Sequence, residues 1–295
     1  MKRFLLLIAI MTAFHSTSFA GDFAIEVYQQ KAKAVVFIVG RSEGRSSMVG
    51  AGSVISTSGI IVTNAHVVID KRTSEPFSNI TVYLKPDKVT GSQKKDLVAP
   101  YTASVKAFDI DLDIAIMKIE GLPTDISVIE LADPEEVKIG GEVVAIGHPE
   151  QGGFWTLTYG RISGEIASQK GIKGKDVYQT DTSVNRGNSG GPLLDKRGYM
   201  VGINTNIARL GAGNLPITGV NFALQSIVVK KWLGEQDIML DYGTKPLYKD
   251  LKPVEVKREG DTILTTKRPY KINDLFKQVE NEMENMMEDM RGKIR

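Results

Sequence analysis

Residues 185–194 read N-R-G-N-S-G-G-P-L-L, a stretch in which one hydroxyl, Ser189, stands among small and polar residues. Two interpretations fit this stretch when it is taken alone. Gly, Asn, Ser and Pro are the residues of tight turns, so Ser189 can be the middle of a turn. A serine held in such a turn can also be a nucleophile. The rest of the sequence decides between these interpretations and, with them, the fold.

The histidines of the chain limit what Ser189 can do. A hydroxyl attacks an amide carbonyl at neutral pH only when a base takes its proton, and histidine suits that task. Besides His15, near the N-terminus, the chain has only His66 and His148, and both precede Ser189. G-N-S-G-G also fits the G-x-S-x-G turn of α/β-hydrolases, but their histidine follows the serine, so that fold is excluded for a triad enzyme. A subtilisin-like order would need Asp22, near the N-terminus, so the order that remains is His, Asp, Ser.

Three aspartates between His66 and Ser189 fall on one face of an extended strand: Asp109, Asp111 and Asp113. One interpretation is a solvated strand edge that carries alternate acids. Asp113 is followed by the apolar run I-A-I-M-K-I, so it is the acid we expect at a domain interface. There it would accept the Nδ1 proton of His66 and leave Nε2 free to take the Ser189 proton.

The two remaining histidines lie in different settings. His66 lies in the apolar stretch I-I-V-T-N-A-H-V-V, where a lone histidine is more often a satisfied core residue than a base. The residue by itself leaves both interpretations open. His148, in A-I-G-H-P-E, stands between Gly and Pro at a turn, and we assign it a structural role.

Short β-branched runs alternate with turn residues from Val35 onward, at a spacing typical of an antiparallel barrel or sandwich. The runs are VVFIV, GSVIS, GIIVTNA, ITVYL, ASVKAF, IAIMKI, EVVAIG, TLTYGRIS, VYQT and MVGINT. Residues 121–136 interrupt them with two prolines and an acidic turn, and are the candidate linker between two β units. Residues 226–233, with Ser226 at the N-cap and Gly234 after the end, predict a short helix that closes the second unit.

Five motifs in this order together resemble the HtrA/DegP branch of trypsin-like serine proteases: T-N-A-H-V-V, D-I-A-I-M-K-I, A-I-G-H-P, N-R-G-N-S-G-G-P-L and V-G-I-N-T. The resemblance covers about residues 25–233. It implies an all-β fold of two perpendicular six-stranded antiparallel barrels, at about residues 25–120 and 135–233, within a protease domain of residues 21–235. It places His66 and Asp113 in the first barrel and Ser189 in the second.

The resemblance also assigns the residues around the nucleophile. The backbone N–H groups of Gly187 and Ser189, with Asn188 as a third candidate, are expected to form an oxyanion hole. Losing one such donor typically lowers the rate by ~10²–10³.

The substrate pocket is expected to be lined by Ser183, Thr205, Ile207, Val220 and Phe222. Ser183 matches the base of the pocket and is neutral, which argues against cleavage after Lys or Arg. The related glutamyl endopeptidases use a pocket histidine on the serine-bearing barrel, where this chain offers only His148, far from the pocket strands. We therefore expect cleavage after Val, Ala, Ile or similar residues.

Residues 1–20 have the pattern of a secretory signal peptide, with Lys2 and Arg3, an apolar run and a small-residue end at Ala20. The apolar run is short of the ~20 residues that span a bilayer, so we expect cleavage rather than an uncleaved anchor. The protein is then exported, to the periplasm or outside the cell.

Removing the two cations of residues 1–20 brings the formal net charge of +2 to zero, which argues against a nucleic-acid partner. With no cysteine, no disulfide or thiolate metal site is possible, and we expect no metal and no cofactor.

Residues 236–295 are predicted to form a C-terminal extension, with a hairpin at residues 254–266 and an amphipathic, Met-rich helix at residues 272–290. The apolar seam of that helix has three open uses: folding back on the β domain, self-association, or a flexible apolar face for substrates or a partner.

PDZ domains, common in the family, need ~80–100 residues. Only 62 residues follow position 233, so we expect none. The resemblance implies a trimer, for which three aromatic residues are candidates besides ordinary core roles: Phe23, Tyr28 and Phe37.

The leading functional hypothesis is an exported serine endopeptidase that acts on unfolded or damaged proteins. The alternative is a chaperone-like module that binds polypeptides with little or no proteolysis. A complete triad and glycine-rich turn favour the enzyme, because binding alone needs neither.

Overall fold

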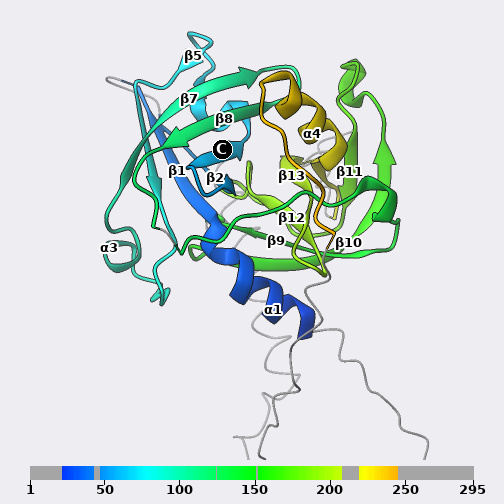
Figure 1. Ribbon diagram of the computed structural model, residues 1–295, viewed down its shortest axis with the longest axis horizontal. Coiled ribbons are helices and arrows are strands. Elements are labelled where there is room, and N and C mark those ends of the chain that lie inside the picture. The colour runs from blue at the N-terminus through cyan, green and yellow to red at the C-terminus, as the bar shows by residue number, and fades with distance from the viewer. Residues whose placement is uncertain (1–21, 43–46, 124, 151, 208–218, 245–295) are drawn as a thin grey trace, which may run out of the picture. The chain divides into compact units, whose positions relative to one another are not determined.

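The computed structural model describes residues 22–42, 47–123, 125–150, 152–207 and 219–244. These residues form two closed, six-stranded antiparallel barrels (Figure 1). The two-barrel fold implied by the resemblance is therefore confirmed. The expected signal peptide, the hairpin at residues 254–266 and the helix at residues 272–290 lie outside the described residues.

The first barrel has the strand order β1-β2-β3-β8-β7-β6. Its strands are β1 (Val35–Arg41), β2 (Ser47–Ser56), β3 (Ile60–Thr63), β6 (Asn79–Tyr83), β7 (Tyr101–Asp109) and β8 (Ile114–Ile119). Apolar β-branched residues let β1 and β8 be buried on both faces, whereas β7 alternates between partly and fully exposed residues. The connections carry α2 (Ala65–Val68), the short pair β4 (Ile69–Asp70) and β5 (Glu75–Pro76), and α3 (Gln93–Asp96).

The second barrel has the order β10-β11-β14-β13-β12-β9. Its strands are β9 (Glu142–Gly147), β10 (Thr156–Ile166), β11 (Val177–Thr180), β12 (Pro192–Asp195), β13 (Met200–Ile207) and β14 (Asn221–Gln225). Two short 3₁₀ turns accompany them, η2 (Pro134–Glu136) and η3 (Gln169–Gly171).

The expected helix after the second barrel is α4 (Ser226–Glu235). The sequence places Ser226 at the N-cap, but the N-cap is Gln225 and Ser226 is the first helical residue. The buried Ser226 hydroxyl has no hydrogen-bond partner among the described residues. The helix also runs through Gly234 to Glu235, one residue beyond the predicted stop.

The segment between the barrels is hydrogen-bonded to both of them. The Ile129 amide donates to the Val54 carbonyl of β2 at 2.9 Å, and the Ala132 amide donates to the Met200 carbonyl of β13 at 2.9 Å. One cluster of buried apolar side chains continues from the first barrel, with Ile61, into the second, with Ile146. The barrels therefore share a core.

The N-terminal helix α1 (Asp22–Lys31) and the turn η1 (Ala32–Ala34) lead into β1 and pack against residues of both halves. The Tyr28 hydroxyl donates to the Trp155 carbonyl at 2.8 Å, and the Lys31 ammonium donates to the Val128 carbonyl at 3.1 Å. Phe23 and Phe37, two of the candidate assembly aromatics, are buried within this chain. Core packing therefore accounts for both.

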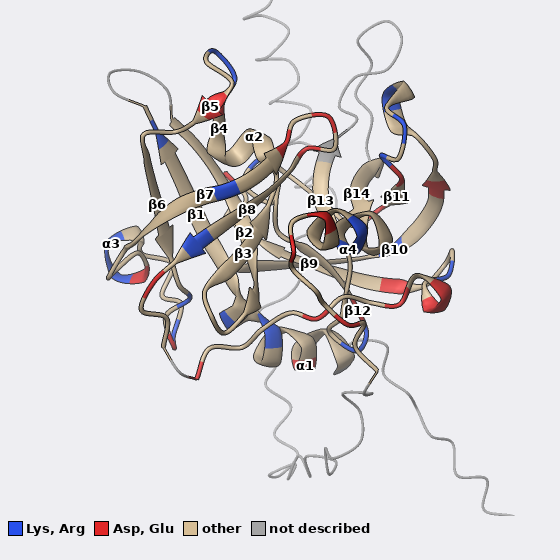
Figure 2. Ribbon diagram, turned by 45° about the horizontal axis from the view of Figure 1, so that its top comes forward, with Lys and Arg blue, Asp and Glu red and all other residues tan. Residues whose placement is uncertain are grey.

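Acidic and basic residues are interspersed over the elements of both barrels (Figure 2). Among the described residues, no helix has the length and apolarity needed to cross a bilayer.

Candidate active site

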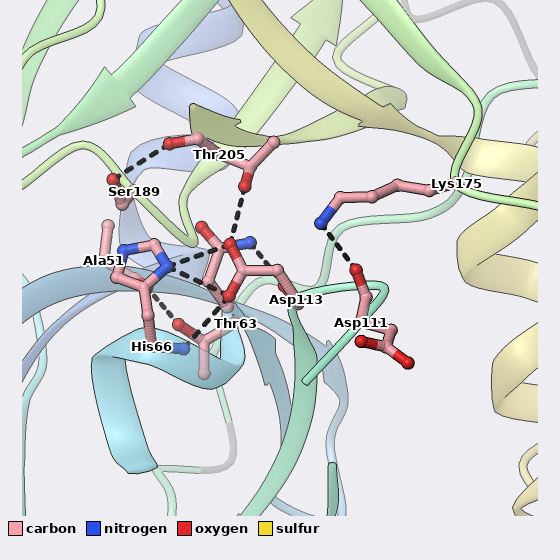
Figure 3. Close-up of polar contacts among 9 residues, drawn as sticks. Ala51, Thr63, His66, Asp111, Asp113, Lys175, Ser189 and Thr205 are labelled. Atoms are coloured by element: carbon pink, nitrogen blue, oxygen red, sulfur yellow. Dashed lines mark hydrogen bonds and ion pairs between the residues drawn. The ribbon is translucent and has the colours of Figure 1, made fainter. Parts of the chain in front are cut away.

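His66, Asp113 and Ser189 come together from three separate segments (Figure 3). His66 lies on the single-turn helix α2, and Asp113 closes the turn between β7 and β8. His66 Nδ1 lies 3.0 and 2.9 Å from the two carboxylate oxygens of Asp113, whose Oδ1 also accepts the His66 backbone N–H at 3.0 Å. This pairing fixes the ring and leaves Nε2 as the free nitrogen.

Asp113 is held by more than the histidine. Its backbone is in the left-handed region, with φ of 62°, and the Asn64 side-chain amide donates to its carbonyl oxygen at 2.8 Å. The Thr205 hydroxyl donates to Oδ2 at 2.7 Å. Burial raises the pKa of Asp113, but the hydrogen bonds from His66 and Thr205 and the charge of His66 outweigh it and hold that pKa below its usual value. The carboxylate is therefore ionised at neutral pH.

The Ser189 hydroxyl donates to the Thr205 carbonyl at 3.3 Å. Thr205 thus serves two members of the triad, with its hydroxyl on Asp113 and its carbonyl on Ser189. Attack on a substrate requires the serine proton to pass to His66 Nε2. Such contacts are often long or misaligned without substrate and tighten when it binds.

The turn before Ser189 is fixed by the segment that follows β9. The Glu150 amide donates to the Arg186 carbonyl at 2.9 Å, and the His148 amide donates to the Gly187 carbonyl at 3.3 Å. In a trans peptide the C=O and N–H point in opposite directions, so holding the Arg186 carbonyl at Glu150 turns the Gly187 N–H the other way.

Two of the three expected oxyanion-hole donors remain available. Among the described residues, neither the Gly187 nor the Ser189 amide donates to a protein acceptor. The Asn188 amide donates to the Asn185 carbonyl at 3.0 Å. The expectation that Asn188 contributes to the hole is therefore wrong for this conformation, because its N–H is used to close the turn.

The nucleophile turn also rests on the first barrel. The Ala51 amide of β2 donates to the Ser189 carbonyl at 2.8 Å. Gly190 is at φ of 83°, and a Cβ there would overlap the Thr63 hydroxyl and the Ala51 carbonyl. Only glycine allows this close approach.

The structure describes four of the five expected pocket side chains, and they lie in different settings. Thr205 lines the cleft beside the triad, but both of its polar groups act on Asp113 and Ser189. Ser183 is exposed after β11, and its carbonyl accepts from the Thr158 hydroxyl at 2.8 Å. Val220 and Phe222 are partly buried at β14. The side chain of Ile207 lies outside the described residues, as do residues 208–218, so the pocket remains a prediction.

A cleft of about 640 Å³ opens beside His66, Asp113 and Ser189. Its walls carry both isoleucines and cations: Ile69, Lys71, Ile110, Lys170, Ile172, Lys175 and Arg186. In the described part of the chain, no group of three or more His, Asp or Glu residues is placed to hold a metal ion.

His148 has the structural role assigned to it, with an added connection to the nucleophile turn through its backbone. It is buried against the rings of Phe37, Phe154 and Trp155, and its Nδ1 accepts the Trp155 backbone N–H at 3.2 Å. Burial lowers the pKa of His148 from 6.5 to about 3, so the ring is neutral.

Sequence reasoning missed Asn64, the triad role of Thr205, and Lys175. Asn64 immediately precedes the helix of His66 and lies in a quoted motif that gave it no role. Thr205 ends the motif V-G-I-N-T and was expected to line the substrate pocket, not to support the triad. Lys175 lies in no motif, and no sequence signal pointed to it.

Comparisons with known proteins agree with this geometry. Residues 50–203 match the family described as trypsin-like peptidase domain. The chain is 36% identical over 192 residues to the putative serine protease HhoA of Synechocystis sp., covering 64% of this chain and 43% of that protein. It is 32% identical over 206 residues to the periplasmic serine endoprotease DegP of Salmonella typhimurium, covering 69% of this chain and 38% of that protein.

Solved structures give the same result. The HtrA-type protease AlgW with tripeptide matches with a TM-score of 0.57 and 26% identity, covering 73% of this chain and 64% of that one. The chain spans about half or less of the length of the curated relatives it matches. Motifs, barrels and triad geometry lead to one conclusion: the chain belongs to the HtrA/DegP family of trypsin-like serine proteases.

Proposed function

We propose that this chain is an exported serine endopeptidase that cleaves unfolded or damaged proteins after small or aliphatic residues. The observation that carries the proposal is the Asp113–His66 pair beside Ser189, next to a turn that leaves the Gly187 and Ser189 amides without acceptors among the described residues. A module that only binds polypeptides needs none of these arrangements.

The proposed reaction assigns these residues to each step of acyl transfer. Ser189 Oγ forms a bond to the substrate carbonyl carbon as its proton passes to His66 Nε2, while Asp113 stabilises the charged ring. The carbonyl oxygen becomes an oxyanion that the Gly187 and Ser189 amides can bind. The carbon–nitrogen bond then breaks, and the leaving amine takes the proton from His66. Water repeats the sequence on the acyl-enzyme and frees Ser189.

Two lines of support concern location and substrate. The Salmonella relative is named periplasmic, which fits the exported state expected from residues 1–20. A neutral Ser183 at the expected base of the pocket offers no counter-charge to a Lys or Arg side chain.

One observation favours the alternative, a chaperone-like module. The Ser189 hydroxyl donates to Thr205, so the resting site is not engaged for attack. Casein digestion by the wild type, Ser189→Ala and the exposed control Ser104→Ala separates the two functions. We expect the wild type and Ser104→Ala to digest casein and Ser189→Ala to lose at least ~10³-fold in rate. A wild type that suppresses aggregation without cutting over a range of temperatures would instead support the chaperone.

The predicted pocket has a test of its own. Cut sites on an unfolded protein, mapped by mass spectrometry, are expected after Val, Ala and Ile. Ser183→Asp is expected to move them toward Lys and Arg, because it adds a negative charge at the expected base of the pocket. Wild-type cuts after Arg, Lys or Glu would contradict this preference.

A further inference from the structure

Lys175 is a buried cation beside the triad that none of the steps above uses. It lies in the second barrel, between η3 and β11, and is 4% exposed. Its ammonium donates to the backbone carbonyl of Asp111 at 2.6 Å, which lies in the turn of the first barrel that ends at Asp113 (Figure 3). The bond therefore joins the two barrels at the cleft that holds the catalytic residues.

A buried ammonium is costly unless opposite charge or hydrogen bonds compensate it. Among the described residues, no carboxylate oxygen lies within 4.0 Å of the Lys175 ammonium, and the Asp111 carboxylate points away from it (Figure 3). Burial lowers the pKa of Lys175, and the charge of Lys170 adds to that shift, whereas the charges of Asp113, Asp109 and Asp111 oppose it. The alternating acids thus supply the negative field that a cation at this position needs.

The bond from Lys175 to Asp111 holds a turn whose backbone is already constrained. Asp113 has a left-handed backbone, and the short turn before it is fixed at Leu112, whose amide donates to Asp109 Oδ1 at 2.8 Å. Both of those features belong to the first barrel. Lys175 fixes the middle of the same turn from the second barrel, the one that carries Ser189.

We propose that Lys175 is a positioning residue of the triad, which fastens the Asp113 turn to the second barrel and keeps a positive charge beside the Asp113–His66 pair. That charge disfavours the uptake of a further proton by the pair. The acid inactivation of the triad is therefore expected to set in at lower pH with Lys175 than without it. This inference rests on the proposed protease function, since it concerns how the same triad works.

The test is the pH dependence of Ser189 labelling by a fluorophosphonate, which needs the triad but no peptide pocket. Lys175→Met removes both the donor and the charge, and Lys175→Gln is a second neutral variant should the first not fold. Lys175→Arg keeps both properties. Lys173→Met is the matched control, because Lys173 is an exposed lysine two residues away in the same loop. The other charges around the cleft and the nucleophile turn stay constant in all variants: Lys71, Asp109, Asp111, Glu150, Lys170 and Arg186.

For either neutral variant we expect the midpoint of the acid limb of the pH–rate profile to rise by about half a pH unit. For Lys175→Met, which also lacks the donor, we expect the plateau rate to fall roughly tenfold. Lys175→Arg and Lys173→Met should keep the wild-type midpoint. Neutral variants that titrate like the wild type would overturn the inference, as would an equal shift in Lys175→Arg. A wild type that is not labelled at all refutes the protease function itself, and the inference with it. Labelling of the wild type with unshifted neutral variants refutes only the role of Lys175.

Discussion

Thr205 shows how one residue can organise two groups of the proposed triad. Its hydroxyl donates to Asp113 Oδ2, and its carbonyl accepts the Ser189 hydroxyl. The hydroxyl bond goes to an ionised group in a buried site, where hydrogen bonds are stronger than average. The carbonyl belongs to the backbone, so a substitution at this position can remove the first contact and keep the second.

Thr205→Val should lower kcat/KM about 10- to 100-fold, because hydrogen bonds to charged groups contribute about 1.5–3 kcal/mol. Thr205→Ser keeps the hydroxyl and should stay within a few-fold of the wild type. Steady-state kinetics on one peptide substrate measure both variants. A serine variant as impaired as the valine variant would show that the methyl group matters and the hydroxyl does not.

His148 makes a residue-scale contribution to stability that depends on pH. Its pKa is about 3 in the folded protein, against 6.5 for the ordinary side chain. Between these values the unfolded chain binds a proton that the folded one does not. The free energy of unfolding should therefore fall as the pH drops below 6.5, by about 1.4 kcal/mol per pH unit from this group.

Urea denaturation at pH 7, 6 and 5 tests this, with Ser189→Ala as background to prevent self-digestion. His148→Gln, whose amide oxygen can accept the Trp155 N–H, should lose most of the slope between pH 6 and 5. All other titratable groups are the same in both proteins, so the difference between them isolates His148. Equal slopes would show that the buried ring is not the source of acid sensitivity.

At the scale of elements, the turn of residues 185–191 depends on the segment after β9. The Arg186 and Gly187 carbonyls are both held by amides of residues 148–150, which fixes the peptide that presents the Gly187 N–H. Gly187 has φ of 94°, and a Cβ there would overlap the His148 carbonyl oxygen. The proposed oxyanion hole therefore depends on the packing of two loops against each other.

Gly187→Ala should lower kcat at least ~10²-fold, because relieving the overlap has to move a hole donor. Gly121→Ala is the matched control: it also has a positive φ, of 73°, but a Cβ there meets nothing within 4 Å. The control should lose about 1 kcal/mol of stability and keep its kcat. Comparable kcat values for the two variants would contradict the role of the β9 segment.

The limits of sequence reasoning lie at this same scale. The rhythm of short strands predicted an antiparallel barrel or sandwich, and the order of His66, Asp113 and Ser189 predicted the triad candidates. The division into two six-stranded barrels came from the family resemblance. Asn188 was assigned to the hole because adjacent amides look alike in a sequence, whereas their directions depend on contacts with Asn185 and Glu150. Lys175 could not be found because its partner is a backbone carbonyl, which no residue type identifies.

At the scale of the whole described region, the barrels share one apolar cluster. Ile61 is fully buried in the first barrel, whereas both tryptophans, Trp155 and Trp232, belong to the second half of the chain. Unfolding of the first barrel would expose the cluster on which the second is packed. The two are therefore expected to unfold in one cooperative transition.

Ile61→Ala should destabilise the protein by about 2–5 kcal/mol, through lost burial and the cavity left behind. Tryptophan fluorescence and far-UV circular dichroism should shift together in urea, although the mutation is in the other barrel. Ile139→Ala, at a position 64% exposed, is the control and should change stability by less than about 0.5 kcal/mol. Separate transitions for the two signals would show that the barrels unfold independently.

The bond between the Ala51 amide and the Ser189 carbonyl has a consequence for biosynthesis. A serine protease is made among unfolded chains, including copies of itself. The first barrel leaves the ribosome before the nucleophile has been translated, and Ser189 reaches His66 and Asp113 only when its turn docks on that barrel. The nascent protein thus carries no working active site until both halves have folded, a safeguard that requires no removable inhibitory segment.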